Sequence, residues 1–190
     1  MKRIFFDLDD TLYKNKKLRE DREKAIISFL GEKAEEYKEL KKNNNTIKSL
    51  EILGISKETF YQIISSVPIE LEKDERLIEI LGRLFENFEL LIISNSPEKI
   101  VEEIIKKLGI EKFFSKLITG DKMKKTKPHP TAFEEIKFGD TVVGNNFDKD
   151  LKIPKQIGAI TILVSESPNS EADFNIHHIY EIDYIKLDKL

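Results

Sequence analysis

The chain contains no cysteine, and this absence excludes several classes of protein. Without cysteine there is no disulfide framework, no zinc–thiolate site and no thiol nucleophile. Long apolar runs are missing as well: the longest block is Leu90–Ile93, and Ile4–Phe6 near the amino terminus is shorter than a signal-peptide core of about 7–15 residues. Neither approaches the roughly 20 residues that span a bilayer, so a cytoplasmic protein without membrane association is expected.

An excess of charge of one sign is also missing. The 190 residues include 32 lysines and arginines and 35 aspartates and glutamates, with a net charge of −3. Basic residues are concentrated only in Lys14–Lys17 and Lys122–Lys127. Since nucleic-acid binders usually show a basic balance or a basic face, no nucleic-acid partner is expected. The length suits one core domain with a modest insert.

Short apolar segments alternate with helical patterns along most of the chain. Apolar runs of this length that end at polar residues are typical of buried parallel strands. Strands that alternate with helices predict an α/β fold with a Rossmann-like parallel sheet. The expected strands are Ile4–Phe6, Leu90–Ile93, Leu117–Thr119, Thr141–Val143 and Thr161–Val164, and the stretch 175–185 is placed only loosely.

A purely helical region separates the first expected strand from the second. An insert at this place would lie at the carboxyl ends of the strands, where open α/β sheets bind ligands. We therefore expect a core of residues 1–13 and 77–190 and a small helical cap of residues 14–76. Helical spacing covers 18–41, 46–53 and 57–66 in the cap, and 74–87, 97–109, 133–137 and 149–156 elsewhere.

The segment Asp7-Leu8-Asp9-Asp10-Thr11 directly follows the first strand. The carboxylates of Asp7 and Asp9 can project into the same space above the strand end. Phosphoryl transfer could use one as a nucleophile and the other as a proton shuttle. Mg²⁺, which prefers oxygen ligands, would offset the negative charges. The alternative is a solvated acidic turn in which Asp10 and Thr11 cap the next segment.

A second polar segment, Ser94-Asn95-Ser96-Pro97, follows the second strand. Backbone amides at the start of a helix can hold a phosphate, and the Ser94 hydroxyl can add a hydrogen bond. The alternative is that Ser94 or Ser96 caps the following helix.

Two further segments complete the set of polar loops. Lys127, before Pro128, could balance the charge of the nucleophile and bind phosphate as a point charge, or be one more surface lysine. Asp148 and Asp150 follow the strand at 141–143 and could hold a metal ion, or cap the following helix.

These four segments, in this order, resemble the four motifs of the haloacid dehalogenase (HAD) superfamily. The opening FFDLDDTLY also resembles the subgroup that includes pyrimidine 5′-nucleotidases. The resemblance runs from Asp7 to Asp150 and implies a phosphatase. Asp7 would attack phosphorus and form an aspartyl-phosphate, while Asp9 would protonate the leaving oxygen, activate water and offer its backbone carbonyl to Mg²⁺.

The resemblance also assigns roles to four other residues. Thr11 would position the loop. Ser94 and the Asn95 amide would bind phosphate oxygens, and Lys127 would hold the nucleophile and the phosphate together.

The fourth motif departs from the family pattern, which usually places a metal-binding acid directly after the strand glycine. Asn145 occupies that position, while Asp150 matches the second acid of the motif, often a ligand through water. Three interpretations stay open: Asn145 binds Mg²⁺ weakly, Asp148 takes over, or the site binds metal poorly.

The expected function is hydrolysis of a small phosphorylated metabolite, such as a mononucleotide, phosphoglycolate or a sugar phosphate, by a monomer or homodimer. One alternative is a non-catalytic or weakly active phosphate-binding protein on the same fold, which Asn145 favours. A lesser alternative is a haloacid dehalogenase. It ranks lower because those members of the family lack an acid at the position of Asp9. Tyr13, Lys14, Lys17 and Arg22 near the cap boundary are candidates for substrate selection, and the sequence offers no basis for choosing among them.

Overall fold

The computed structural model describes residues 1–187 and divides into two compact units. One comprises Met1–Lys14 and Leu71–Leu190, and the other Asn15–Glu70. The helical unit therefore ends at Glu70 and not at residue 76. The reason is that Asp74 already belongs to the first unit, where its N–H donates to the carbonyl of Leu108 and its carboxylate caps the next helix. Residues 188–190 of the expected core lie outside the described part.

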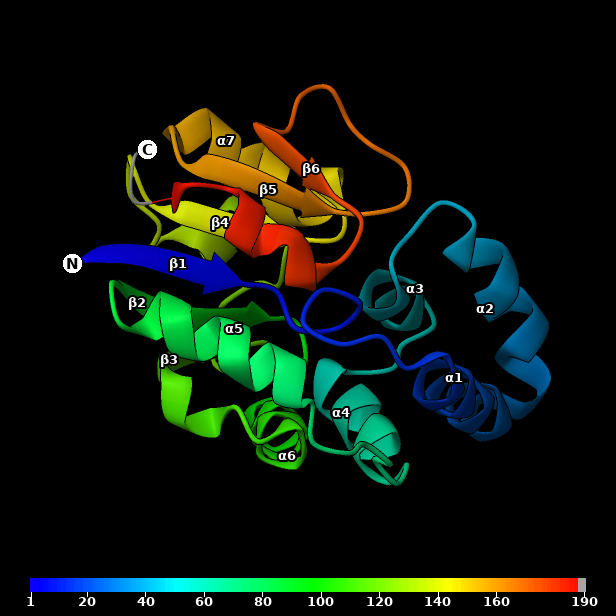
Figure 1. Ribbon diagram of the computed structural model, residues 1–190. Coiled ribbons are helices and arrows are strands. Elements are labelled where there is room, and N and C mark those ends of the chain that lie inside the picture. Colours follow the sequence, from blue (N-terminus) through cyan, green and yellow to red (C-terminus); the bar gives the residue numbers. More distant parts are fainter. Residues whose placement is uncertain (188–190) are drawn as a thin grey trace. The chain divides into compact units, whose positions relative to one another are not determined.

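Six parallel strands form a single sheet in the first unit, in the order β3-β2-β1-β4-β5-β6 (Figure 1). The order confirms the predicted Rossmann-like α/β class, and each of the five predicted strands is present. The sixth overlaps the start of the stretch 175–185, which sequence patterning placed only loosely. The strands are β1 (Lys2–Phe6), β2 (Phe88–Ser94), β3 (Phe114–Thr119), β4 (Thr141–Gly144), β5 (Ile160–Val164) and β6 (Phe174–Ile176).

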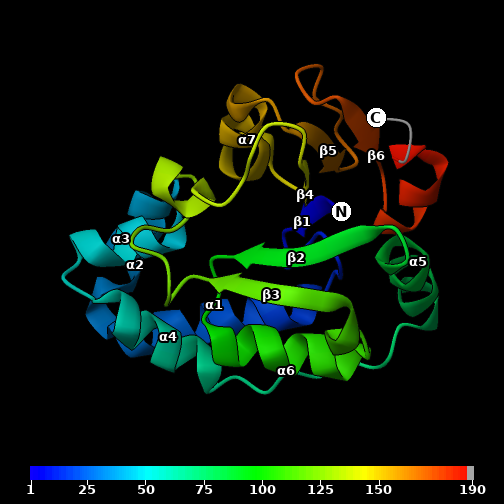
Figure 2. The ribbon, with the colours of Figure 1, turned by 90° about the vertical axis from the view of Figure 1, so that its left-hand side faces the viewer.

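Helices cover both faces of this sheet. Figure 2 shows α6 running along β3 on one face, with α7 on the other. Because successive side chains of a strand point to opposite faces of the sheet, β1 contributes side chains to both faces. Phe5 joins the cluster beneath α7, while Phe6 contacts the ring of Phe114. The α-helices are α5 (Glu75–Phe85), α6 (Glu98–Leu108) and α7 (Lys152–Ile157), and the short ones η2 (Glu111–Phe113), η3 (Pro130–Phe133), η4 (Phe147–Leu151) and η5 (Ile179–Tyr184).

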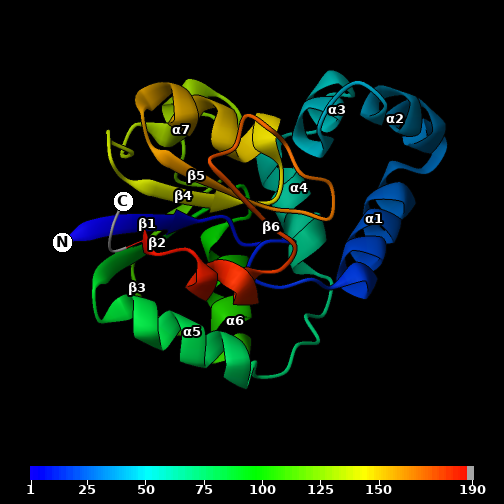
Figure 3. The same ribbon diagram turned by 45° about the horizontal axis from the view of Figure 1, so that its top comes forward.

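The second unit is built from helices alone (Figure 3). α1 packs against α4, and α3 contacts both α2 and α4. The single helix predicted over 18–41 is wrong, because the chain breaks at Gly31. This residue has a φ of 54°, a backbone conformation that glycine adopts readily and other residues rarely. The elements are α1 (Lys16–Leu30), η1 (Gly31–Lys33), α2 (Ala34–Lys41), α3 (Thr46–Ile52) and α4 (Lys57–Ser65).

The short helix predicted over 133–137 is also misplaced, since the structure has a single 3-10 turn, η3, that ends at Phe133. Pro130 starts this turn, and the ring of His129 caps it by accepting a hydrogen bond from the N–H of Thr131. Proline is favoured at the first position of a helix, so the turn begins earlier than the apolar pattern indicates. Within residues 1–187, no helix combines the length and the apolar character that crossing a membrane requires.

Candidate active site

The carboxyl ends of β1, β2 and β4 lie side by side in the middle of the sheet. Phe6 of β1 pairs with Ile92 on one side and with Val143 on the other. The chain therefore brings Asp7, Ser94 and the end of β4 to the same edge. Open parallel sheets bind their ligands at this edge. The residues that the sequence predicts for the site therefore lie where such a fold is expected to bind a ligand.

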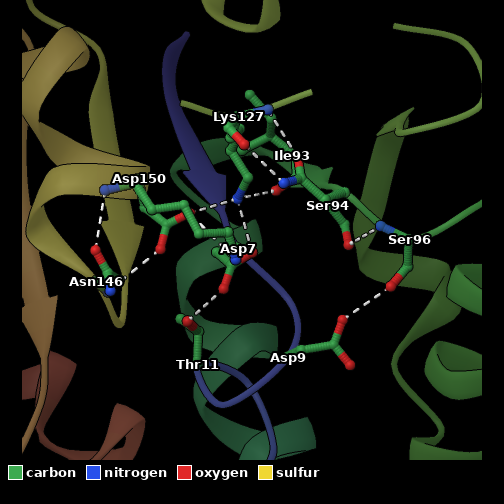
Figure 4. A network of polar contacts seen from close by, with 11 residues as sticks. Asp7, Asp9, Thr11, Ile93, Ser94, Ser96, Lys127, Asn146 and Asp150 are labelled. Atoms are coloured by element: carbon green, nitrogen blue, oxygen red, sulfur yellow. Dashed lines mark hydrogen bonds and ion pairs between the residues drawn. The ribbon is translucent and has the colours of Figure 1, made fainter. Parts of the chain in front are cut away.

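Asp7 is buried at the end of β1, with 2% of its surface exposed. Its backbone N–H extends the sheet by donating to the carbonyl of Val143 at 2.8 Å. Its carboxylate accepts two hydrogen bonds, one on Oδ1 from Lys127 Nζ at 2.7 Å and one on Oδ2 from Thr11 Oγ1 at 2.9 Å (Figure 4). The orientation of this carboxylate is thus fixed by a cation and a hydroxyl.

The ammonium group of Lys127 lies between two buried carboxylates. It is 2.7 Å from Asp7 Oδ1 and 2.7 Å from Asp150 Oδ1, and it donates to the carbonyl of Ile93 at 2.9 Å. Lys127 and Asp150 are each only 1% exposed. Lys127 therefore forms an ion pair with both buried carboxylates, whose charges would be costly to bury without it. The alternative of a surface lysine is wrong.

The backbone of Lys127 is held by the side chain of Asn95. The Asn95 amide donates to the carbonyl of Lys127 at 2.9 Å, and its oxygen accepts the N–H of Lys127 at 2.8 Å. These two bonds connect the loop after β2 to the loop that carries Lys127 before the cis peptide bond to Pro128. The side chain of Asn95 thus positions the lysine, a role that sequence reasoning did not assign to it.

The charges around Asp7 favour its ionised form. Burial raises the pKa of Asp7, but the positive charges of Lys127 and Lys149 and the hydrogen bonds from Lys127 and Thr11 outweigh burial and hold this pKa below its ordinary value. Burial raises the pKa of Asp150, and although Lys127 opposes this, the negative charge of Asp7 adds to it, so the pKa of Asp150 lies above its ordinary value. Of the two carboxyl groups, that of Asp7 is therefore the more readily ionised, and a carboxyl group must be ionised to act as a nucleophile.

Lys149 adds a second positive charge next to these acids. Its Nζ is 4.0 Å from Asp150 Oδ1, and its side chain is 37% exposed. Burial lowers the pKa of Lys149, whereas the negative charges of Asp7 and Asp150 raise it, and the net direction is upward. Lys149 is therefore a cation at the rim of the site, in a position that sequence reasoning did not single out.

The loop after β1 returns on itself within a few residues. Asp10 has a φ of 61°, and the N–H of Leu12 donates to the carbonyl of Leu8 at 3.0 Å. The turn places Tyr13 beside Asp9, and the two residues form an isolated backbone bridge. Tyr13 Oη donates to Asp9 Oδ1 at 2.5 Å. Tyr13 thus holds one oxygen of Asp9 from within the same loop.

The loop after β2 contributes hydroxyl groups at the same edge. Ser94 is 1% exposed, and its Oγ accepts the N–H of Ser96 at 3.1 Å. Ser96 Oγ in turn donates to Asp9 Oδ2 at 3.0 Å. The following helix begins at Glu98, whose N–H donates to the carboxylate of Asp121 at 3.1 Å. Asp121 therefore accepts the hydrogen bond at the start of this helix. The hydroxyl of Ser96, which the sequence offers as a cap for the same helix, donates to Asp9 instead.

The loop after β4 separates the three predicted metal-ligand candidates. Asn145 directly follows the strand and is partly exposed. Asp150 faces the site, where its Oδ2 also accepts the N–H of Asn146 at 3.2 Å. The side chain of Asp148 is 81% exposed and pairs with Lys152 at 3.0 Å. The structure therefore brings Asp150 to Lys127 and leaves Asp148 outside the site, contrary to the suggestion that Asp148 replaces a ligand.

Within residues 1–187, no group of three or more Asp, Glu, His or Cys side chains is arranged to hold a metal ion.

Gly144 at the end of β4 makes room for Asp150. A Cβ atom on Gly144 would lie 2.6 Å from Asp150 Cβ, far inside the roughly 3.5–4.0 Å between non-bonded carbons. We expect Gly144→Ala to lower the free energy of unfolding by about 1–3 kcal/mol and to move Asp150 away from Lys127. Urea denaturation measures the first effect. As a control, Gly82→Ala adds a methyl group 3.8 Å from the ring of Phe113 and should not destabilise; similar losses in both variants would contradict this account.

Comparisons with known proteins define the class of protein. The haloacid dehalogenase-like hydrolase family matches residues 4–137, which is well over half of the chain. The chain therefore belongs to the haloacid dehalogenase-like hydrolases, as its four motifs predict. The resemblance to pyrimidine 5′-nucleotidases within that superfamily stays a prediction.

Solved structures with the same fold include proteins of two activities. The HAD phosphatase from Thermococcus onnurineus superposes with a TM-score of 0.70 at 18% identity over 97% of each chain. The 2-haloacid dehalogenase from Pseudomonas syringae pv. tomato DC3000 superposes with a TM-score of 0.65 at 18% identity over the whole of each chain. At such identities the likeness shows the fold alone, so the choice between these chemistries depends on the residues of the site.

One curated relative is the phosphoglycolate phosphatase from Vibrio parahaemolyticus serotype O3:K6 (strain RIMD 2210633). It is 27% identical over an alignment of 77 residues that covers 37% of this chain and 34% of that protein. The chain thus matches about a third of the length of this relative.

Proposed function

We propose that the protein is a magnesium-dependent phosphatase that hydrolyses phosphomonoesters of small metabolites through an aspartyl-phosphate on Asp7. One observation carries the proposal: a buried carboxylate at the end of β1 is paired with Lys127, while a second carboxylate, Asp9, is held apart by hydroxyl groups. Two carboxylates with different partners suit two roles, a nucleophile and an acid–base group.

The first step forms the covalent intermediate. An oxygen of Asp7 bonds to phosphorus, and the bond between phosphorus and the ester oxygen breaks. The leaving oxygen takes the electron pair of that bond together with a proton from Asp9. The ammonium of Lys127, 2.7 Å from Asp7, holds the nucleophile and balances part of the negative charge that the phosphoryl group brings.

The second step regenerates the site. Water loses a proton to Asp9 as its oxygen bonds to phosphorus, and the bond between phosphorus and Asp7 breaks. Asp7 is again a carboxylate, Asp9 is again protonated, and phosphate and the alcohol are the products. The Ser94 hydroxyl and the backbone amide of Asn95 lie at the end of β2 and would bind the phosphoryl oxygens, as the second motif implies.

The oxygen donors present fit a magnesium ion with one protein carboxylate. Asp150 Oδ1 lies buried 2.7 Å from Lys127 Nζ and has no hydrogen-bond partner among residues 1–187. As the family motifs imply, the direct ligands would be the Asp7 carboxylate, the backbone carbonyl of Asp9 and the side-chain oxygen of Asn145, and Asp150 would act through a water molecule. Mg²⁺ typically takes one or two carboxylates and completes its shell with water and substrate phosphate, so this set suffices. When bound, the ion supplies positive charge next to the transferred phosphoryl group.

Asp9 favours phosphatase chemistry over the dehalogenase reaction. An alkoxide leaving group needs a proton donor, and a halide does not, so an acid at this position has a use only with phosphate esters. Candidate substrates are mononucleotides, phosphoglycolate and sugar phosphates, and the short match to a phosphoglycolate phosphatase supports including the second.

The test is phosphate release from a substrate panel with Mg²⁺ and with a chelator. We expect turnover that requires the metal, and no halide release from a short 2-haloacid. Halide release without phosphate release would overturn the proposal. Metal-independent binding of phosphate without turnover would instead support a phosphate-binding protein, the alternative that the neutral Asn145 favours.

Because the side chain of Asn145 carries no charge, we expect the site to bind Mg²⁺ weakly. Asn145→Asp adds a carboxylate at the position where the family usually has one, and we expect Mg²⁺ to bind roughly 10-fold more tightly. Isothermal titration calorimetry measures this without any assay of turnover. Asn146→Asp adds the same charge at the next residue, whose side chain caps the turn after β4, and serves as the control. Equal gains in both variants would show a general charge effect and contradict a ligand role for residue 145.

A further inference from the structure

The carboxylate of Asp9 is held by two neutral hydroxyl groups from different loops. Tyr13 donates to Oδ1 at 2.5 Å from the loop after β1, and Ser96 donates to Oδ2 at 3.0 Å from the loop after β2. Figure 4 shows the carboxylate turned toward Ser96 and away from Asp7. Each oxygen therefore has its own donor, and together the two bonds define both the position and the rotation of the group.

The residues that carry these hydroxyl groups are held by burial and by backbone hydrogen bonds. Tyr13 is 8% exposed, so its ring has little freedom. The backbone of Tyr13 is bridged to that of Asp9, and the turn between them is closed by the hydrogen bond from Leu12 to Leu8. Ser96 follows the buried end of β2 by two residues, and its own N–H is held by Ser94. These contacts thus place both hydroxyl groups at the carboxylate of Asp9.

The partners of the two carboxylates differ in kind. Asp7 is paired with an ammonium group, which can only donate hydrogen bonds and so favours a permanent anion. Asp9 is paired with hydroxyls, which can donate to a carboxylate or accept from a carboxylic acid.

We infer that Tyr13 and Ser96 are positioning residues for Asp9, an assignment that rests on the proposed phosphatase function. They hold the carboxyl group at the place from which it protonates the leaving oxygen and later takes a proton from water. Neither residue need touch the substrate. Loss of either hydroxyl removes one of the two hydrogen bonds that orient the carboxylate of Asp9 and lets the side chain rotate away from the productive orientation.

The test compares two leaving groups. An alkyl phosphate needs a proton on its leaving oxygen, whereas an aryl phosphate with a nitrophenol leaving group departs readily without one. The ratio kcat/KM reports only the steps up to this departure, so slow hydrolysis of the intermediate does not mask the effect. With Mg²⁺ present, Tyr13→Phe and Ser96→Ala should each lower kcat/KM by about 10-fold for the alkyl ester and by no more than about 3-fold for the aryl ester, since general acid catalysis is worth about 10²–10⁴-fold in all.

Matched variants separate positioning from simple damage. Ser96→Thr keeps a hydroxyl and should restore most of the activity toward the alkyl ester. Tyr180→Phe removes a similar tyrosine–aspartate bond, to Asp74 at 2.5 Å, and Ser115→Ala removes a serine hydroxyl that donates to Glu89 at 2.8 Å. Both lie outside the site and should leave the ratio between the two substrates unchanged.

The outcomes are distinct. A selective loss on the alkyl ester, rescued by threonine at position 96, supports the inference. An equal loss on both esters, or no loss on either, overturns it while leaving the phosphatase intact. If the wild type hydrolyses neither ester with Mg²⁺, the proposed function fails and the inference fails with it.

Discussion

Asp7→Asn should abolish hydrolysis of every phosphate ester that the wild type accepts, with kcat reduced by roughly 10³-fold or more. The amide is a poor nucleophile and cannot form an aspartyl-phosphate. The fold should persist, because an asparagine side chain has nearly the same shape as aspartate and Lys127 keeps its ion pair with Asp150 at 2.7 Å. Steady-state kinetics measure the first effect, and circular dichroism with urea denaturation checks the second.

A control for this variant is Asp183→Asn, the same replacement at a residue that pairs with Arg83 away from the site. It should retain full activity. Turnover by Asp7→Asn at a substantial fraction of the wild-type rate would show that another residue attacks phosphorus. A variant that fails to fold would instead indicate that Asp7 is needed chiefly as a buried partner of Lys127.

Lys127→Met should have the largest effect on stability. The side chain is 0% exposed and is the counter-ion of Asp7 and Asp150, whose side chains are 3% and 1% exposed. Its removal leaves two buried carboxylates that repel each other. We expect the free energy of unfolding to fall by about 3–5 kcal/mol, together with loss of turnover because the nucleophile is no longer held.

The matched replacement is Lys116→Met, which removes an exposed lysine paired with Glu135 at 2.7 Å. Pairs of this kind contribute no more than about 1 kcal/mol. Comparable losses for the two lysine variants would contradict the burial argument. The double variant Lys127→Met, Asp150→Leu should recover part of the stability, because it removes one of the two uncompensated charges.

The sequence predicts the sheet, and the edge of the sheet at which the polar loops gather, for a physical reason. Strands such as Ile4–Phe6 and Leu90–Ile93 are buried on both faces and therefore appear as unbroken apolar runs. Because parallel strands all end at the same edge, polar residues that follow them must converge. The proximity of Asp7 and Lys127 follows from this rule combined with the family motifs, although the sequence separates them by 120 residues.

The pairings within the site were less predictable, because they depend on how loops fold back. The sequence suggests Asn95 as a phosphate ligand, and its bonds to the backbone of Lys127 are visible only in three dimensions. Tyr13 lies four residues after Asp9, but in a loop this spacing does not specify a contact. The hydroxyl of Ser96 suggests a helix cap, and only the structure shows that it donates to Asp9.

The helical unit shows a different limit of sequence patterning. Apolar spacing alone extends one helix over residues 18–41, since the residues on both sides of Gly31 suit a helix. The break requires a backbone conformation with φ of 54°, and nothing in the periodicity signals it. The boundary at Glu70 is not visible in the helical pattern for a related reason, since the contacts of Asp74 with Leu108 and Tyr180 are long-range.

The most direct test of the central claim is to trap the covalent intermediate. The protein is mixed with Mg²⁺ and an aryl phosphate, quenched in acid within one turnover, and digested for mass spectrometry. The account predicts one added phosphoryl group, located on Asp7 and absent from Asp7→Asn. Rapid turnover with no phosphoryl group on the protein, or with the group on another residue, would contradict the proposed mechanism.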